Sequence, residues 1–135
     1  NCSYRKTGMQ ECQPDISYYV GEKAQAIPRG NNIVDLDKFP APDLVIEVAK
    51  TSLLDDQGAK RLLYEDLNIG EYWVVDVEKS EVTAFAIANQ GSYRICESQI
   101  IQGLQMATLE QALRQAQETD QSQVGNWLMQ QFSAN

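Results

Sequence analysis

The chain has 135 residues, with 11 Lys and Arg against 19 Asp and Glu, a net charge of −8 and no histidine. The lack of histidine excludes, within these residues, Ser-His-Asp and Cys-His nucleophile pairs and imidazole metal ligands. Catalysis here would have to use carboxylates, Lys, Tyr or a hard metal ion, because the side chain best suited to proton transfer near neutral pH is missing.

Length and cysteine content limit the class of protein further. A chain of this size predicts a single domain with its own core. Cys2, Cys12 and Cys96 are scattered and form no CxxC pair, which argues against a disulfide framework and favours a reducing, cytoplasmic setting. No apolar run is long enough to span a bilayer, so we expect no membrane partner. The net charge, taken alone, disfavours nucleic acid.

The first half of the chain combines two strand patterns with a long loop. Residues 14–20 alternate apolar and polar side chains and are rich in aromatic and β-branched residues, which predicts a strand. Residues 21–42 contain Pro, Gly and Asn at high density, which is typical of a loop, and loops this long are often functional. Residues 43–49 predict a strand covered on both faces, because their apolar run is interrupted only by Glu47.

The second half contains three further strands and two helices. Apolar residues at i, i+4 and i+8 predict a helix over 52–67. Strands are predicted at 71–77, 81–88 and 93–96, with a hairpin turn at 89–92. The Thr108-Leu109-Glu110-Gln111 pattern is that of a capping box and predicts that a helix begins there.

The C-terminal segment and the order of elements complete the expected architecture. Residues 117–135 are acidic and Gln-rich, and the helical spacing of apolar residues over 124–132 predicts a helical extension. The element order predicts an α/β (α+β) fold with a mixed sheet. The strand–helix–strand unit over 43–77 should be a right-handed parallel crossover.

Three charged residues suggest a site. Asp15 opens the first predicted strand, Glu47 lies inside an apolar strand, and Lys60 lies on the following helix. A charge within a buried strand is costly unless it is paired or bound to metal. Two carboxylates, with water and carbonyl oxygens, suit Mg²⁺ or Mn²⁺, which would polarise a phosphodiester and help to generate hydroxide. A nearby ammonium could then orient the water or stabilise the developing charge.

A purely structural interpretation accounts for the same residues. Glu47 could pair with Lys50 or Lys60, and Asp56 with Lys60 at i, i+4 could be an ordinary helix ion pair. Asp15 could simply mark a turn after Pro14. Strand alternation directs Lys50 away from Glu47 unless the strand ends or bulges there. Spacing alone leaves both interpretations open.

The motifs resemble a known family. The matching residues are Pro14-Asp15 before the first strand, Pro42-Asp43-Leu44-Val45-Ile46-Glu47-Val48-Ala49, Thr51-Ser52, Asp56-x-x-x-Lys60-x-x-x-Tyr64 and Ile69-Gly70-Glu71-Tyr72-Trp73-Val74-Val75-Asp76. Together they resemble a bacterial family of putative restriction-endonuclease-like proteins in the PD-(D/E)XK nuclease superfamily. The resemblance covers roughly residues 12–113 and is most specific over 42–76.

The resemblance implies a fold, an activity and a site. The implied fold is a restriction-endonuclease-like mixed sheet flanked by helices, and the implied activity is Mg²⁺- or Mn²⁺-dependent hydrolysis of DNA. Asp15 and Glu47 would hold the metal. The lysine that usually stands two residues after the acid is replaced by Ala49, and its role maps to Lys60. Further pocket residues would be Asp56, Tyr64 and Lys50.

The resemblance also bears on domain organisation and partners. Members usually carry an N-terminal helical region before the first motif, so residues 1–135 would be one domain that lacks most of it. A homodimer is expected, since many such enzymes cut two strands with two subunits. Binding to DNA would need a local basic face to offset the net charge, with these candidates: Arg5, Lys6, Lys23, Arg29, Lys38, Lys60 and Arg61.

A second function from another class fits the same pattern. The chain could be a catalytically inactive nuclease-fold domain that acts in protein interaction or assembly, because a fold does not fix a function. The acidic, Gln-rich C-terminal segment favours this alternative.

Overall fold

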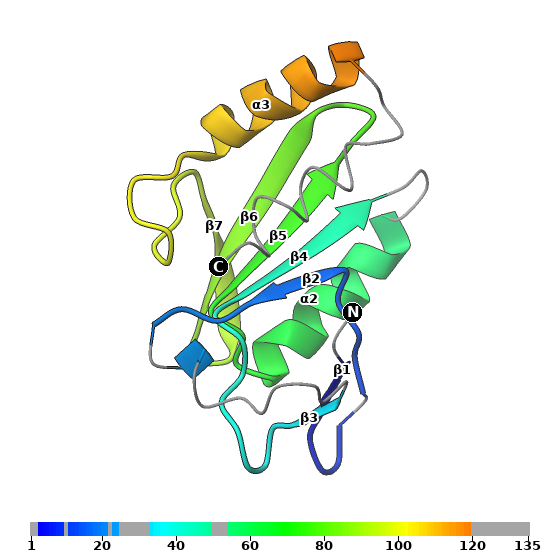
Figure 1. Cartoon of the computed structure of the whole chain (residues 1–135). Coiled ribbons are helices and arrows are strands. Elements are labelled where there is room, and N and C mark those ends of the chain that lie inside the picture. Colours follow the sequence, from blue (N-terminus) through cyan, green and yellow to red (C-terminus); the bar gives the residue numbers. More distant parts are fainter. Residues whose placement is uncertain (1–2, 10, 22, 25–32, 50–53, 120–135) are drawn as a thin grey trace.

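The computed structural model describes residues 3–9, 11–21, 23–24, 33–49 and 54–119 (Figure 1). In chain order its elements are β1 (Ser3–Arg5), β2 (Ile16–Tyr18), β3 (Ile33–Asp35), β4 (Leu44–Ala49), α2 (Leu54–Asp66), β5 (Glu71–Asp76), β6 (Glu81–Ala88), β7 (Gly91–Ile95) and α3 (Met106–Thr119).

A five-stranded mixed sheet forms the centre of the molecule. Its strand order is β2-β4-β5-β6-β7, and only β4 and β5 run parallel, which confirms the parallel unit predicted over 43–77. The two helices cover opposite faces of this sheet (Figure 1). The predicted mixed sheet flanked by helices is therefore confirmed.

Alternating residues of the central strands supply two apolar cores. Leu44 and Ile46 of β4 pack in the core beneath α3 together with Leu113. Val45 packs in the opposite core with Tyr64 of α2. This alternation explains why β4 is apolar on both faces, as a strand between two layers must be.

Helix α2 ends in a Schellman motif. Asn68 adopts a left-handed conformation with φ of 60°. Its N–H donates to the Glu65 carbonyl at 3.1 Å, and the Ile69 N–H donates to the Tyr64 carbonyl at 3.2 Å. These two bonds satisfy carbonyls that the helix end leaves open. The glycine that follows, Gly70, has a different task.

Gly70 allows two strands to begin side by side. Its N–H donates to the Pro42 carbonyl at 3.3 Å, and its carbonyl accepts from the Ile87 N–H at 3.0 Å. A Cβ at this position would overlap the Asp43 carbonyl oxygen and lie 2.9 Å from Ile100 Cδ1. The backbone of the turn before β5 therefore packs directly against that of the segment before β4.

Two expectations from the second half need correction. Helix α3 begins at Met106, so Thr108 lies inside the first turn and is not the cap that the Thr108–Gln111 pattern predicted. The Thr108 N–H donates to the Gln105 carbonyl at 3.1 Å, as in a helix already under way. The hairpin between β6 and β7 is confirmed, but its turn is only Asn89 and Gln90, both with positive φ, because β7 begins at Gly91 and not at residue 93 as predicted.

The first half contains a second, smaller sheet that the sequence did not reveal. Strands β1 and β3 pair in parallel, and β3 lies within the segment predicted as a loop over 21–42. Tyr4 and Val34, the central residues of these strands, are almost fully buried in the core on the α2 side. A strand of three residues is too short to produce a readable alternation.

The predicted helical segment over 124–132 lies outside the described residues. Within the described part of the chain, neither helix has the length and apolarity needed to cross a membrane.

Candidate functional site

Glu47 is a buried carboxylate that points from β4 toward α2. It is 6% exposed and lies in register with Val74 of β5. The Tyr64 hydroxyl donates to Glu47 Oε1 at 2.6 Å, and the Lys60 ammonium donates to Glu47 Oε2 at 3.1 Å. Lys60 and Tyr64 share one face of α2 because they are four residues apart. The structure thus brings three of the residues named from the sequence into direct contact.

Burial raises the pKa of Glu47 above its usual value of 4.5. The hydrogen bonds from Tyr64 and Lys60 and the charge of Lys60 act in the opposite direction, while the negative charge of Asp15 adds to the rise. Burial, and then the bond to Glu47, raise the pKa of the Tyr64 hydroxyl, so Tyr64 acts as a neutral donor.

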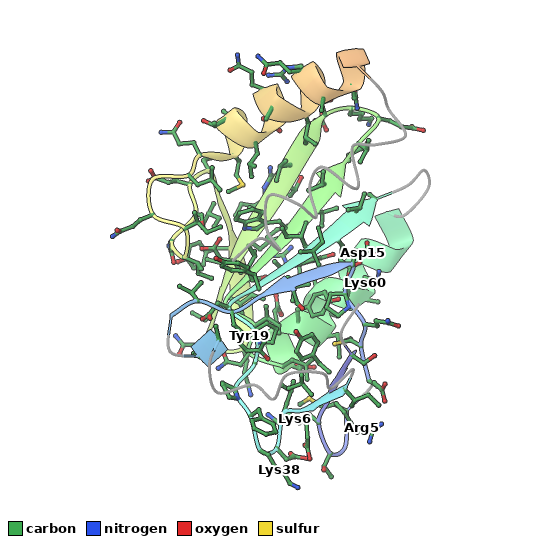
Figure 2. The ribbon with its side chains drawn as sticks, viewed as in Figure 1. Arg5, Lys6, Asp15, Tyr19, Lys38 and Lys60 are labelled. Carbon is green, nitrogen blue, oxygen red and sulfur yellow. The ribbon has the colours of Figure 1, made fainter. Side chains whose placement is uncertain are left out.

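Asp15 is fixed beside the same strand. It lies just before β2, is partly buried, and accepts a hydrogen bond through Oδ2 from the Val48 N–H at 2.9 Å. That N–H belongs to the residue after Glu47, so Asp15 is held against β4 next to the position of Glu47. Figure 2 labels Asp15 at the start of β2 and Lys60 on α2.

A cavity of about 220 Å³ opens onto this group. Glu47, Lys60 and Tyr64 line it on one side. Residues 11–13, which directly precede the Pro14-Asp15 motif, line another side, and the Cys12 side chain among them is 8% exposed. Sequence reasoning missed this segment, and its adjacency to the first motif is the signal that could have drawn attention to it.

Two expected pocket residues cannot be placed. Lys50 and the side chain of Asp56 lie outside the described part of the structure. The pairing of Glu47 with Lys60, foreseen by the structural interpretation, is present.

Asp15 and Glu47 would suit a hard cation that takes few of its ligands from the protein. Within the described residues, no group of three or more acidic, thiol or imidazole side chains converges on one point. Mg²⁺ keeps several waters and is commonly held by one or two carboxylates, so Asp15 and Glu47 are the two residues that could hold it here. Main-chain carbonyls and water would complete the coordination.

A second buried acid shows by contrast what a structural carboxylate looks like. Glu71 is 1% exposed. It accepts hydrogen bonds from Trp73 Nε1, Ser98 Oγ and the N–H groups of Gln99 and Ile100, at 2.6–3.0 Å. These donors tie the segment after β7 to the start of β5. Glu47 accepts from fewer donors and borders a cavity, so it differs from a carboxylate that only holds the structure together.

The fold is that of a restriction-endonuclease-like protein, with Glu47 on a central strand, Asp15 just before the edge strand β2 and Lys60 on α2. The model of the Uma2 family, described as putative restriction endonuclease, matches residues 1–124. The chain belongs to this family.

A solved structure shares the fold. It is the crystal structure of a putative nuclease belonging to DUF820 from Anabaena variabilis, which is 18% identical, with a TM-score of 0.55 over 82% of this chain. The match spans 65% of that protein's length. Comparison with curated proteins found no match.

Proposed function

We propose that this chain is a divalent-metal-dependent endonuclease that hydrolyses phosphodiester bonds in DNA. Asp15 and Glu47 hold Mg²⁺ or Mn²⁺, and Lys60 assists the attack on the phosphate. The observation that carries the proposal is Glu47, a buried acid that borders a cavity and is held by an ammonium and a hydroxyl. Membership of the Uma2 family supports the same reaction class.

Each residue has a distinct task in this proposal. The metal, when bound, polarises the phosphate and lowers the pKa of a coordinated water. Asp15 presents its carboxylate from the start of β2, and its bond to the Val48 N–H keeps it near Glu47. Lys60 orients the attacking water or stabilises negative charge that develops on the phosphate. Tyr64 fixes Glu47 Oε1 and so sets the orientation of that carboxylate.

The position of Lys60 supports a transferred lysine role. Position 49 on β4 is alanine, so the strand itself offers no ammonium two residues after the acid. Helix α2 instead brings Lys60 Nζ to 3.1 Å from Glu47 Oε2. The absence of histidine agrees with a site in which a hard metal does the work of imidazole.

A plasmid-nicking assay tests this function. The purified protein should convert supercoiled plasmid to the open circle with Mg²⁺ or Mn²⁺. Glu47→Gln and Asp15→Asn should each reduce the rate of nicking by more than ~10–100-fold. That range is the loss expected when only a hydrogen-bond partner of a metal ligand is removed. Asp66→Asn is the matched control, because Asp66 is an exposed acid at the far end of α2 and its substitution removes the same charge. Nicking that survives in Glu47→Gln would refute the proposal.

Calorimetry with Mn²⁺ gives a readout independent of cleavage. We expect binding by the wild-type protein and by Asp66→Asn, and a loss of binding in Glu47→Gln and Asp15→Asn. Absence of Mn²⁺ binding by the wild-type protein, or binding that neither substitution weakens, would contradict the assigned metal ligands.

We further propose that the described elements form one domain and that the protein works as a homodimer in the cytoplasm. Two subunits suit the cutting of two strands. A reducing compartment would keep Cys12 and Cys96, which form no disulfide within the described residues, in the thiol form. A sedimentation experiment on the purified chain should give twice the monomer mass.

A further inference from the structure

Ion pairing divides the cations of the described chain into two groups. Arg5, Lys23, Lys60 and Arg61 each form a salt bridge with a carboxylate. All four belong to the basic face that the sequence suggested for DNA. Their charges are compensated locally, so they contribute little to attracting a polyanion.

Five cations of the described residues form no salt bridge: Lys6 and Lys38 lie at the β1–β3 end of the molecule, and the other three meet at a different surface. Lys79 lies in the turn between β5 and β6, Arg94 lies on β7, and Arg114 lies on α3. They line one groove of about 470 Å³, which we call the β6–α3 groove. Within the described residues, none of the three forms a salt bridge, and all three are exposed.

The groove exists because β7 is shorter than β6. The last residue of β7, Ile95, pairs with Ala84, so residues 81–83 of β6 extend beyond their neighbour. Helix α3 lies over this end of the sheet (Figure 1). Glu110 of α3 accepts a hydrogen bond from the Val82 N–H at 2.9 Å, which satisfies the exposed strand edge.

The charge balance of the groove is opposite to that of the chain. Its lining holds the three cations and two carboxylates, Glu81 and Glu110, and the latter is engaged by the Val82 N–H. Ser80 also lines the groove, and its hydroxyl is buried and makes no hydrogen bond within the described part of the chain. A local positive excess in a molecule of net charge −8 marks the groove as a site for an anion.

The groove lies at the same end of the sheet as the candidate metal site. Glu47 pairs with Val74, and Val74 pairs with Thr83, which lines the groove. The three residues form one row across the sheet. Glu47 and Thr83 are therefore two strand spacings apart, about 10 Å. Paired residues point to the same face of a sheet, so Thr83 shares the α2 face with Glu47, whereas Arg114 reaches the groove from α3 on the other face.

We propose that Lys79, Arg94 and Arg114 bind backbone phosphates of duplex DNA beside the site that cleaves it. The proposal rests on the nuclease function for its choice of ligand. It explains how a strongly acidic protein can hold DNA. Such contacts fix position and carry no base information, so the groove should act on all sequences alike.

Binding of a fluorescent 20-base-pair duplex, measured by anisotropy in EDTA, tests the groove without cleavage. We expect Lys79→Ala/Arg114→Ala to weaken binding by roughly tenfold or more at low salt. The slope of log Kobs against log salt should fall by about 1 for each cation removed. The matched control is Lys6→Ala/Lys38→Ala, which removes two charges at the opposite, β1–β3 end of the molecule (Figure 2).

Further readouts separate this inference from the nuclease assignment. In the groove variant, Mn²⁺ binding by calorimetry and hydrolysis of the small diester bis(p-nitrophenyl) phosphate should be unchanged, whereas plasmid nicking should fall. A protein that binds DNA through the groove but binds no metal would refute the nuclease function alone. Equal losses in the two double variants, an unchanged salt slope, or no binding of DNA by the wild-type protein would refute the groove.

Discussion

At the scale of single residues, the site depends on how a buried acid is compensated. Glu47 and Glu71 are both removed from water, and both would be unstable as isolated charges. Glu71 is satisfied by donors from its own surroundings and holds a loop. Glu47 receives one charged and one neutral donor, and its pKa stays raised because burial outweighs them. An acid left in this condition beside a cavity is poised to exchange a proton or accept a cation.

Tyr64→Phe tests the orienting role of the Tyr64 hydroxyl. The variant keeps the ring contact with Tyr72, whose ring centre is 4.9 Å away, but removes the donor to Glu47 Oε1. We expect a ~10–100-fold loss of Mn²⁺ affinity and of plasmid nicking, and a stability loss of about 1 kcal/mol.

The pH profile separates this role from a purely structural one. The Tyr64 hydrogen bond lowers the pKa of Glu47, so its removal should raise that pKa further and keep Glu47 protonated to higher pH. The acid limb of the nicking profile should therefore move to higher pH in Tyr64→Phe. A uniform loss of activity at every pH would show that the hydroxyl serves stability alone.

The residue contacts also show which part of the site the sequence could predict. Glu47 was identifiable because a charge interrupts an apolar strand. Lys60 and Tyr64 were identifiable because they are four residues apart and so share one face of the helix that follows this strand. The Asp15 to Val48 contact and the lining by residues 11–13 were not identifiable. Both depend on tertiary packing of segments far apart in the chain, which no local period encodes.

At the scale of elements, long patterns predicted well and short ones did not. Strands β4, β5 and β6 were found because each presents six or more residues of apolar or alternating character. Strands β1 and β3 have three residues each and depend on one buried side chain apiece. The Thr108 pattern misplaced the start of α3 because a capping motif is defined by four residues and also occurs inside a helix.

Gly70→Ala tests the close approach of backbones before β4 and β5. The added methyl group would overlap the Asp43 carbonyl oxygen, which is main chain and cannot swing away. We expect a loss of about 1–3 kcal/mol in the free energy of unfolding, measured by urea denaturation. Gly58→Ala is the matched control, because Gly58 lies in α2 with open space at its Cβ and alanine favours a helix. Equal stability of Gly70→Ala and the wild type would contradict the close approach.

At the scale of the whole molecule, two sheets of unequal size share the core on the α2 side. The five-stranded sheet is sandwiched between helices, whereas β1 and β3 form a two-stranded sheet joined through Tyr4 and Val34 to the α2 side. The small sheet also supports the site, because residues 11–13, which follow β1, line the cavity. An antiparallel β-bridge between Tyr4 and Cys12 connects this segment to β1, with the Tyr4 N–H donating to the Cys12 carbonyl at 2.7 Å.

Hydrogen exchange should resolve the two sheets. The amides of β1 and β3 should exchange faster than those of β4 and β5, because an isolated strand pair has few neighbours to protect it. Mass spectrometry of peptic peptides would measure this order. Protection of β1 and β3 equal to that of the central strands would show that both sheets open as one unit.

The contact between Lys60 and Glu47 determines when, during folding, the site becomes complete. The acid and the ammonium belong to a strand and a helix, and Asp15 reaches them from a third segment. None of these groups is near another until the strands have paired and α2 has packed. If the chain has the proposed nuclease function, a nascent or misfolded copy would therefore lack a complete site with which to cut DNA. Under that proposal, placing the ammonium on the helix would make correct folding a condition for cleavage.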